Sequence, residues 1–397
     1  MKNGKASLRL VIRVVSIVVI LTTLGSCHGR KDMTTSKKTE STADEMPLSY
    51  NIYVENSGSM AGFCNYSDTE ALETLIGDYY DRINSLSSDG DSITLNFINT
   101  TIEIGESEKN EYLKSIKGKC IAKYTKIDDM LTKMMESVTD KDVNIMVSDY
   151  VFTTNEGNLS TAASQITSLF TKQLKEKQDL AVAIFKYMRD FHGEYYPGGI
   201  PCNKPLPIYV WVFGKDKNVQ KFADMPFSTQ NCGEYYLQLS QSPEFVLSAN
   251  NSRMITEDKK GIIVSKWDAE RHKDFYEFSA EIDLVNSLLS EKDILNKSCY
   301  NTTSNTSANY KIVRIEPTTD GKYKYTIRTD KPSPGILTIQ YPMQTPAWVA
   351  QSNFEGSGIP SDSTTFGIKY LIDGVSKAFN DASGNKSNYF EININLE

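Results

Sequence analysis

The stretch that decides the fold is "NIYVENSGSMAGF", residues 51–63. Three apolar residues are followed at once by Glu55 and by two hydroxyls, Ser57 and Ser59, with Gly58 between them. A tight turn would direct both hydroxyls to one side, and a glycine lets the backbone bend there. The pattern indicates a strand that ends in a polar turn, and such a turn is either a simple connection or one half of a metal site.

The chain around this stretch alternates between apolar strand-like runs and segments with helical spacing. Alternation of this kind predicts an α/β fold with a doubly wound, mostly parallel, Rossmann-like sheet covered on both faces. The expected strands are 48–54, 93–98, 143–147, 180–187 and 208–213, and the expected helices lie around 72–83, 127–134, 166–174 and 219–222.

The pattern changes near residue 240. Apolar and polar residues alternate in 323–327 and in 390–396, and Asp320-Gly321 predicts a hairpin between 310–315 and 323–327. One helix is expected at 370–379, and the polar segment 296–309 is expected to be an exposed loop. We therefore predict two domains, an α/β domain at 48–238 and a smaller β-rich domain, of sandwich type, at 239–397.

The amino terminus carries a targeting signal. A basic region precedes the apolar run 14–24, which is too short to cross a bilayer as a helix. The sequence Leu24-Gly25-Ser26-Cys27 resembles a bacterial lipobox, which implies a signal peptide at 1–27 and lipidation of Cys27, including a palmitate-type acyl chain. The resemblance implies a lipid anchor in the cell envelope, periplasmic or surface-exposed, with 28–47 as a disordered tether. An ordinary secretory signal with a chance cysteine is the alternative.

Two later segments add to the opening motif. Thr125 comes directly before the expected helix at 127–134, and Asp149 comes directly after the apolar strand 143–147. Ligands of doubly wound sheets bind beyond the carboxyl ends of the strands. Together with the acid and the two serines of the opening motif, these side chains form an all-oxygen set. Such a set suits Mg²⁺, and Mn²⁺ or Ca²⁺ as alternatives.

These segments resemble the von Willebrand factor type A (VWA) domain and its metal-ion-dependent adhesion site (MIDAS). "ENSGSM" matches the family's Asp-x-Ser-x-Ser with Glu55 for the aspartate, "YTKIDDML" provides Thr125, and "IMVSDY" provides Asp149. The resemblance implies that Ser57, Ser59 and Thr125 hold the cation, that the two acids act through waters, and that a protein partner's carboxylate completes the coordination. It implies adhesion and no catalysis. Tyr150 stands where the family has glycine.

Other functions fit the sequence less well. The net charge of −7 argues against nucleic-acid binding, and only three histidines are present. A serine hydrolase would need Gly-x-Ser-x-Gly, which the glycines around Ser59 do not form. A metal-dependent phosphotransfer hydrolase would need more Asp and His ligands. A structural envelope lipoprotein with a degenerate metal site also remains open.

Five cysteines follow Cys27, and an exported protein meets an oxidising compartment. If the metal site forms, Cys64 and Cys120 lie in loops at the same end of the sheet and are expected to pair. Cys202 and Cys232 flank one strand–helix unit and are expected to pair as well. The alternative is that all five are buried free thiols.

Overall fold

The structure is a computed structural model that describes residues 46–64, 71–123, 125–152, 158–196, 199–249, 254–257, 261–264, 275–318, 321–361 and 363–396. The signal peptide, Cys27 and the tether up to residue 45 lie outside these residues, so the predictions for them stay predictions. Within the described residues, no helix is long and apolar enough to cross a membrane.

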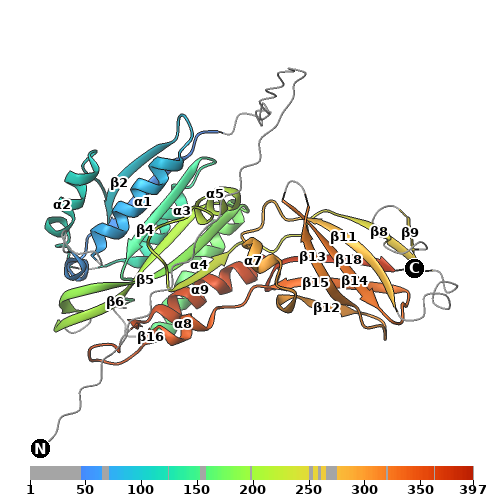
Figure 1. Cartoon of the computed structure of the whole chain (residues 1–397). Coiled ribbons are helices and arrows are strands. Elements are labelled where there is room, and N and C mark those ends of the chain that lie inside the picture. The colour runs from blue at the N-terminus through green and yellow to red at the C-terminus, as the bar shows by residue number, and fades with distance from the viewer. Residues whose placement is uncertain are drawn as a thin grey trace, which may run out of the picture. The chain divides into compact units, whose positions relative to one another are not determined.

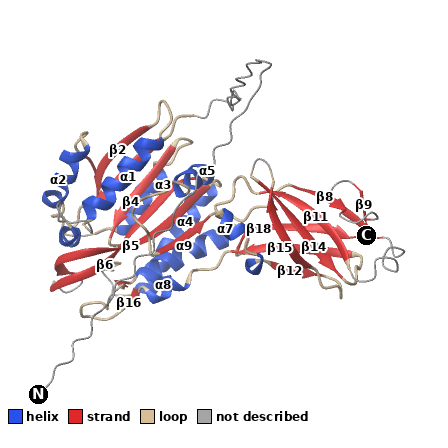
Figure 2. Ribbon diagram, viewed as in Figure 1, coloured by secondary structure: helices blue, strands red, loops and turns tan. Residues whose placement is uncertain are grey.

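The first half of the described chain forms a seven-stranded sheet in the order β3-β2-β1-β4-β6-β5-β7 (Figures 1 and 2). Its central strands alternate buried side chains between two separate hydrophobic cores, so both faces are covered. The strands are β1 (Ser49–Glu55), β2 (Ser92–Ile98), β3 (Ile102–Ile104), β4 (Asp142–Ser148), β5 (Leu180–Tyr195), β6 (Ile200–Lys215) and β7 (Gly233–Leu237).

Helices pack on both faces of this sheet. One core includes residues of α1 (Leu72–Leu86), α2 (Lys109–Lys119) and α5 (Asp216–Ala223). The other core includes residues of α3 (Ile127–Glu136), α4 (Leu159–Glu176) and α9 (Ile368–Ala382) (Figure 1). The α/β class is therefore confirmed, and α2 is a helix that the sequence reading did not include.

The sheet is mixed, which corrects the prediction of a mostly parallel sheet. Only β1 with β2 and β1 with β4 pair in parallel, whereas β2/β3, β4/β6, β5/β6 and β5/β7 are antiparallel. The reason is the connection between β5 and β6. The expected strands 180–187 and 208–213 are both longer in the structure and pair as a hairpin up to Tyr195 and Ile200. A hairpin reverses the chain, whereas a parallel neighbour requires a crossover.

The second half of the chain forms two smaller sheets, as expected for a β-rich sandwich (Figure 2). Inward residues include Phe278, Ile327, Ile339 and Ile392, all buried in one hydrophobic core. One sheet has the order β12-β15-β18-β10-β9 and the other β13-β14-β11-β8. The strands are β8 (Phe245–Ala249), β9 (Met254–Glu257), β10 (Gly261–Val264), β11 (Tyr276–Asp283), β12 (Asn301–Ser304), β13 (Lys311–Pro317), β14 (Lys322–Thr329), β15 (Gly335–Pro342) and β18 (Asn388–Leu396).

In this half, one sequence prediction is confirmed and another is corrected. The predicted hairpin is present as β13 and β14. The segment 296–309 is not entirely loop, because it contains the short 3₁₀ helix η2 (Lys297–Cys299) and β12, which pairs with β15. A short α-helix, α7 (Glu291–Ile294), precedes it.

A late segment of the chain returns to the α/β sheet. It comprises α8 (Ala347–Gln351), β16 (Asn353–Phe354), β17 (Thr365–Phe366) and α9. Helix α9 packs along α4, and Thr167 Oγ1 donates a hydrogen bond to the Gly374 carbonyl at 2.9 Å. Phe152 N donates to the Phe366 carbonyl at 3.0 Å. The boundary predicted at 238/239 stays a prediction, but the helix expected in the second domain contributes to the core of the first.

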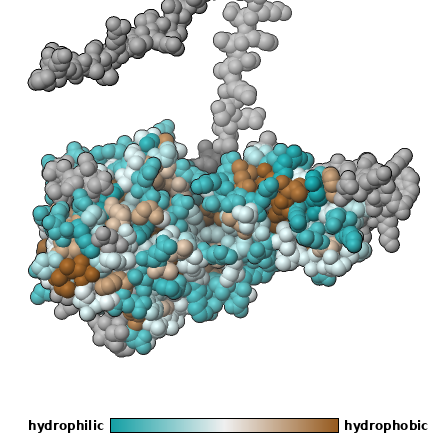
Figure 3. All heavy atoms as spheres, turned by 60° about the horizontal axis from the view of Figure 1, so that its bottom comes forward, coloured by the Kyte–Doolittle hydropathy of each residue, from teal (hydrophilic) through white to brown (hydrophobic). Residues whose placement is uncertain are grey.

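The face of the molecule drawn in Figure 3 is mostly hydrophilic, with a few separate hydrophobic patches. Scattered apolar residues of this kind are normal on water-facing surfaces. Charged side chains of the described residues also form surface ion pairs, such as Lys109 with Asp81 at 2.7 Å.

Candidate functional site

The predicted oxygen ligands meet at the carboxyl edge of β1 and β4. Glu55 is the last residue of β1, and Asp149 directly follows β4, its parallel neighbour. Ser57 caps the 3₁₀ helix η1 (Gly58–Phe63), which carries Ser59, and Thr125 lies just before α3. Carboxyl ends of parallel strands meet at one edge of a sheet, so the strand ends bring these side chains together.

Backbone hydrogen bonds hold the two loops of the site against each other. Gly58 N donates to the Ala122 carbonyl at 2.9 Å, and Ala122 N donates to the Asn56 carbonyl at 3.0 Å. These bonds fix the loop before Thr125 beside the serine turn. The position of the threonine hydroxyl is thereby set by backbone structure on both sides.

Glu55 is fully buried, and hydroxyls donate to both of its carboxylate oxygens. Thr125 Oγ1 donates to Oε1 at 2.5 Å, and Ser148 Oγ donates to Oε2. Ser148 also accepts a hydrogen bond from Tyr150 N at 2.8 Å. Ser148 was missed in the sequence reading, although a serine that ends an otherwise apolar strand is the signal that marks it.

The serine motif is linked to Asp149. Ser57 Oγ and Ser59 Oγ share a hydrogen bond of 3.0 Å, and Ser59 also hydrogen-bonds to Asp149. Val151 N donates to Asp149 Oδ1 at 3.1 Å. The five predicted residues therefore fall into two hydrogen-bonded groups, Glu55 with Thr125 and Asp149 with Ser59 and Ser57. The two groups are close enough for the charge of Glu55 to act on Asp149.

The electrostatics of this set favour a proton or a cation. Burial, and next to it the negative charge of Glu55, raise the pKa of Asp149 to about 7. The hydrogen bonds from Ser59 and Val151 N oppose this shift without cancelling it. Two buried carboxylates close together are costly when both are ionised, and a cation between them would offset that cost.

The Tyr150 side chain packs in the core. Its phenol ring is fully buried and stacks on Trp211 with 4.8 Å between ring centroids, in the core that contains α3 and α4. Its backbone φ is 49°, in the left-handed region that glycine adopts most readily. The backbone therefore keeps a conformation typical of glycine, while burial and then the charge of Glu55 raise the pKa of the phenol.

Two asparagines beside the site were also missed. Asn56 follows Glu55 directly, and Asn99 directly follows β2, whose last residue Ile98 is paired with Glu55. In the described structure, Asn56 Oδ1 and both polar atoms of the Asn99 amide are buried without a hydrogen-bond partner. A buried amide usually has a partner, so this edge has polar atoms available to a water or a ligand. The signal in the sequence is an asparagine just after each apolar strand.

The set has few carboxylates. Among the described residues, no group of three or more His, Cys, Asp and Glu side chains is close enough to hold a metal ion. Transition metals that need imidazole or thiolate ligands therefore do not fit this site. Two carboxylates with several hydroxyls fit a hard cation that retains part of its water shell.

The described cysteines are free thiols. Cys64 and Cys120 are neighbours: a hydrogen bond that the Cys64 thiol donates to Cys120, together with burial, raises the pKa of Cys64. Their disulfide stays a prediction. The bridge between Cys202 and Cys232 is excluded. Cys202 lies opposite Gly193 on β5, while Cys232 N bonds to Lys186, seven residues away (193 − 186). Seven residues of strand span roughly 23 Å, and a disulfide needs Cα atoms within about 7 Å.

Comparison with known proteins gives no relative for this chain. No family model matches it, and neither a curated protein nor a solved structure matches it. The function is therefore argued from the site itself.

Proposed function

We propose that this chain is a lipid-anchored protein of the bacterial cell envelope that binds a protein partner through a divalent cation, in the manner of a VWA domain. The observation that carries the proposal is the pair of neighbouring hydroxyl–carboxylate groups at the carboxyl edge of β1 and β4. They consist of Glu55 with Thr125 and of Asp149 with Ser59 and Ser57, which come from three separate segments of the chain.

The hydrogen-bond directions support a cation at this place. A threonine hydroxyl that donates its proton to Glu55 keeps its lone pairs free for a metal ion. Ser57 and Ser59 share one hydrogen bond, so each hydroxyl still has at least one lone pair for a metal ion. Mg²⁺ accepts such neutral oxygens together with one or two carboxylates and waters.

Two further features support the VWA-like assignment. In the order β3-β2-β1-β4, β1 has one parallel neighbour on each side, β2 and β4, and helices cover both faces of the sheet. Tyr150 adopts the left-handed backbone at the position where the family has glycine. The departure is Glu55, which is longer than aspartate and whose two oxygens are engaged by Thr125 and Ser148.

In the proposed mechanism, the cation is Mg²⁺, with Mn²⁺ or Ca²⁺ as substitutes. Ser57, Ser59 and Thr125 would hold it, and Glu55 and Asp149 would balance its charge. When bound, the ion would supply a coordination position for a partner carboxylate. Two hydroxyls orient the Glu55 carboxylate, and a cation at the site would favour the ionised form of Asp149. No catalytic group is assigned.

The test is a melting curve of the full chain with Mg²⁺ or Mn²⁺ and with a chelator. A ligand present at about 100 times its dissociation constant stabilises the fold by roughly 2.7 kcal/mol. We expect the metal to raise the melting temperature of the wild type and not that of Asp149→Ala. The control is Asp89→Ala, which removes an exposed carboxylate in the turn before the amino end of β2. This variant should retain the full rise in melting temperature.

Equal melting of the wild type with metal and with chelator would overturn the proposal and favour a structural envelope protein with a degenerate site. A rise that persists in Asp149→Ala would place the ion elsewhere. Hydrolysis of a phosphate ester, dependent on the metal, would favour the phosphotransfer alternative.

A further inference from the structure

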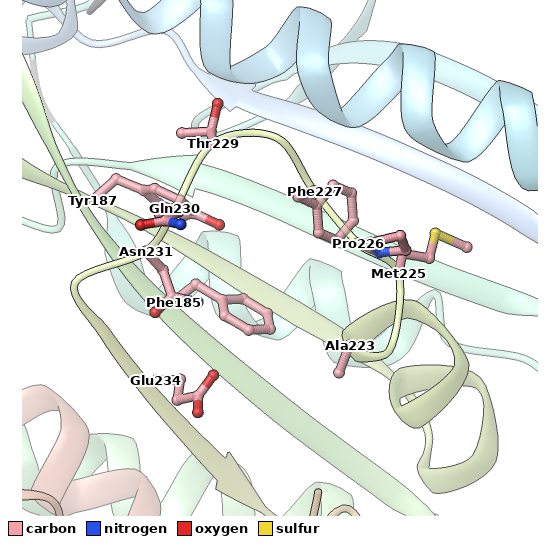
Figure 4. Close-up of a pocket in the computed structure, with 10 residues that line it drawn as sticks. All are labelled: Phe185, Tyr187, Ala223, Met225, Pro226, Phe227, Thr229, Gln230, Asn231 and Glu234. Carbon is pink, nitrogen blue, oxygen red and sulfur yellow. The ribbon is translucent and has the colours of Figure 1, made fainter. Parts of the chain in front are cut away.

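A pocket of about 330 Å³ lies on the α1 and α5 side of the sheet, next to β5 and β7. Figure 4 shows that Phe185 and Glu234 rise from these strands, while the other wall is the loop after α5. The lining residues are Phe185, Tyr187, Ala223, Met225, Pro226, Phe227, Thr229, Gln230, Asn231 and Glu234. A volume of this size is typical of sites for small molecules.

The aromatic walls of the pocket are fixed by neighbours. Tyr187 is 2% exposed, and its hydroxyl hydrogen-bonds to that of Tyr79 at 2.6 Å. Phe227 packs edge-on against Tyr79 with ring centroids 4.5 Å apart. Phe185 packs edge-on against Tyr236 at 6.0 Å. These contacts therefore hold the three lining rings in place, and Phe185 and Tyr187 are almost fully buried behind the pocket.

The loop that forms the opposite wall is also anchored. The carboxylate of Asp78 on α1 accepts hydrogen bonds from Ser228 N at 3.3 Å and from Thr229 N at 2.8 Å. At the end of the loop, Cys232 N donates to the Lys186 carbonyl at 2.8 Å. A pocket held at both ends of its loop is largely formed before any ligand binds, which lowers the entropy cost of binding.

The charged side chain in the described lining of the pocket is an acid. Its described lining includes the carboxylate of Glu234 and no lysine, arginine or histidine. Two more carboxylates, those of Asp78 and Asp224, lie close enough to raise the pKa of Tyr187 and Tyr236 respectively, although burial is the main cause in both tyrosines. A positive group, the guanidinium of Arg189, lies outside this lining at 5.6 Å from the Tyr187 ring centroid.

We propose that this pocket binds a small organic cation, with the ammonium group between the aromatic rings and Glu234. Aromatic faces attract cations through the ring quadrupole, and aromatic sites of this kind recognise quaternary ammonium groups. Glu234 supplies the opposite charge, with Oε2 already held by the Tyr236 hydroxyl at 3.2 Å. Thr229, Gln230 and Asn231 provide hydrogen-bonding groups for the remainder of the ligand.

The experiment compares choline with 3,3-dimethylbutan-1-ol, in which carbon replaces the ammonium nitrogen and the charge is absent. Both are titrated into the full chain by calorimetry. We expect choline to bind and the isostere to bind about tenfold more weakly or not at all. Glu234→Gln should weaken choline by about tenfold, whereas Glu106→Gln, the same change at an exposed site near β3, should leave its affinity unchanged. Phe185→Leu should also weaken choline, because it keeps an apolar side chain and removes the ring.

Equal affinity for choline and its isostere, or binding of neither, would overturn the proposal. Binding of glucose without binding of choline would also overturn it and indicate a site for neutral polyols. The wild-type comparison of the two probes decides the question even if a variant fails to fold. The titration is run in chelator and repeated with Asp149→Ala, so its result does not depend on the metal proposal.

Discussion

The ionisation of Asp149 is expected to make the stability of the fold depend on pH. Its folded-state pKa is about 7, against 3.8 for the free side chain, mainly because of burial and then because of Glu55. The folded state therefore binds this proton more tightly than the unfolded state. The resulting stabilisation is fully present below about pH 4 and is lost as the pH rises through about 7.

We expect the metal-free protein to lose up to about 4 kcal/mol of unfolding free energy over this range. Asp149→Asn should flatten the loss, because the amide does not titrate. The measurement is denaturant unfolding in chelator at a series of pH values. A wild-type profile that rises between pH 4 and pH 7 would contradict the assignment of the shift to this carboxyl.

Single residues also show what the sequence could and could not predict of the site. The positions of the five predicted ligands follow from the sequence, because each stands close after a strand or before a helix. Ser148, Asn56 and Asn99 were missed because their roles depend on which neighbouring strands lie beside them. The direction of Tyr150 was unpredictable for the same reason, since the space beside Trp211 is formed by β6.

At the scale of elements, the contact between α4 and α9 gives a test of packing. A Cβ on Gly374 would lie 2.7 Å from the Ala163 carbonyl oxygen and 3.3 Å from the Ile166 Cβ. Gly374→Ala should therefore destabilise the fold by roughly 1–3 kcal/mol, although alanine favours helices. The measurement is equilibrium unfolding in urea.

Gly118 in α2 is the matched control. No heavy atom outside its own helix neighbourhood lies within 4 Å of a Cβ placed there. Gly118→Ala should be neutral or stabilise the protein by up to about 1 kcal/mol. Similar effects of the two substitutions would show that helix propensity, and not the close approach of α4 and α9, governs Gly374.

The elements themselves were largely predictable, and their pairing was not. The helices at α1, α3, α4, α5 and α9 and most strands follow from apolar spacing, which is local. The antiparallel insertion of β6 between β4 and β5 depends on the hairpin that ends at the pair Tyr195 and Ile200, beside Gly199 with φ of 59°. The sequence Pro197-Gly198-Gly199 is a turn signal, but the predicted strands ended at 187 and began at 208. The sequence therefore did not show that both strands extend to this signal and pair as a hairpin.

For the whole molecule, the anchor at Cys27 stays a prediction. Cys27→Ser should release the protein from membranes or leave the signal peptide uncleaved, because the thiol is the acceptor of the lipid. Membrane fractionation and gel migration measure both outcomes. Cys299→Ser, in the β-rich half, is the control and should behave as the wild type. Identical fractionation of Cys27→Ser and wild type would rule out the anchor.

The return of α9 to the α/β sheet affects how the molecule is made. Helix α9 begins at residue 368 of 397, yet it belongs to the same core as α3 and α4. A ribosome therefore has to synthesise the β-rich half before this helix can join α3 and α4 on that face of the first sheet. Domains usually fold as they emerge, and here the emerging α/β half lacks one helix of its own core until residue 368 and those after it have been made. For a chain with the proposed export signal, we expect this order of synthesis to delay the completion of the α/β core.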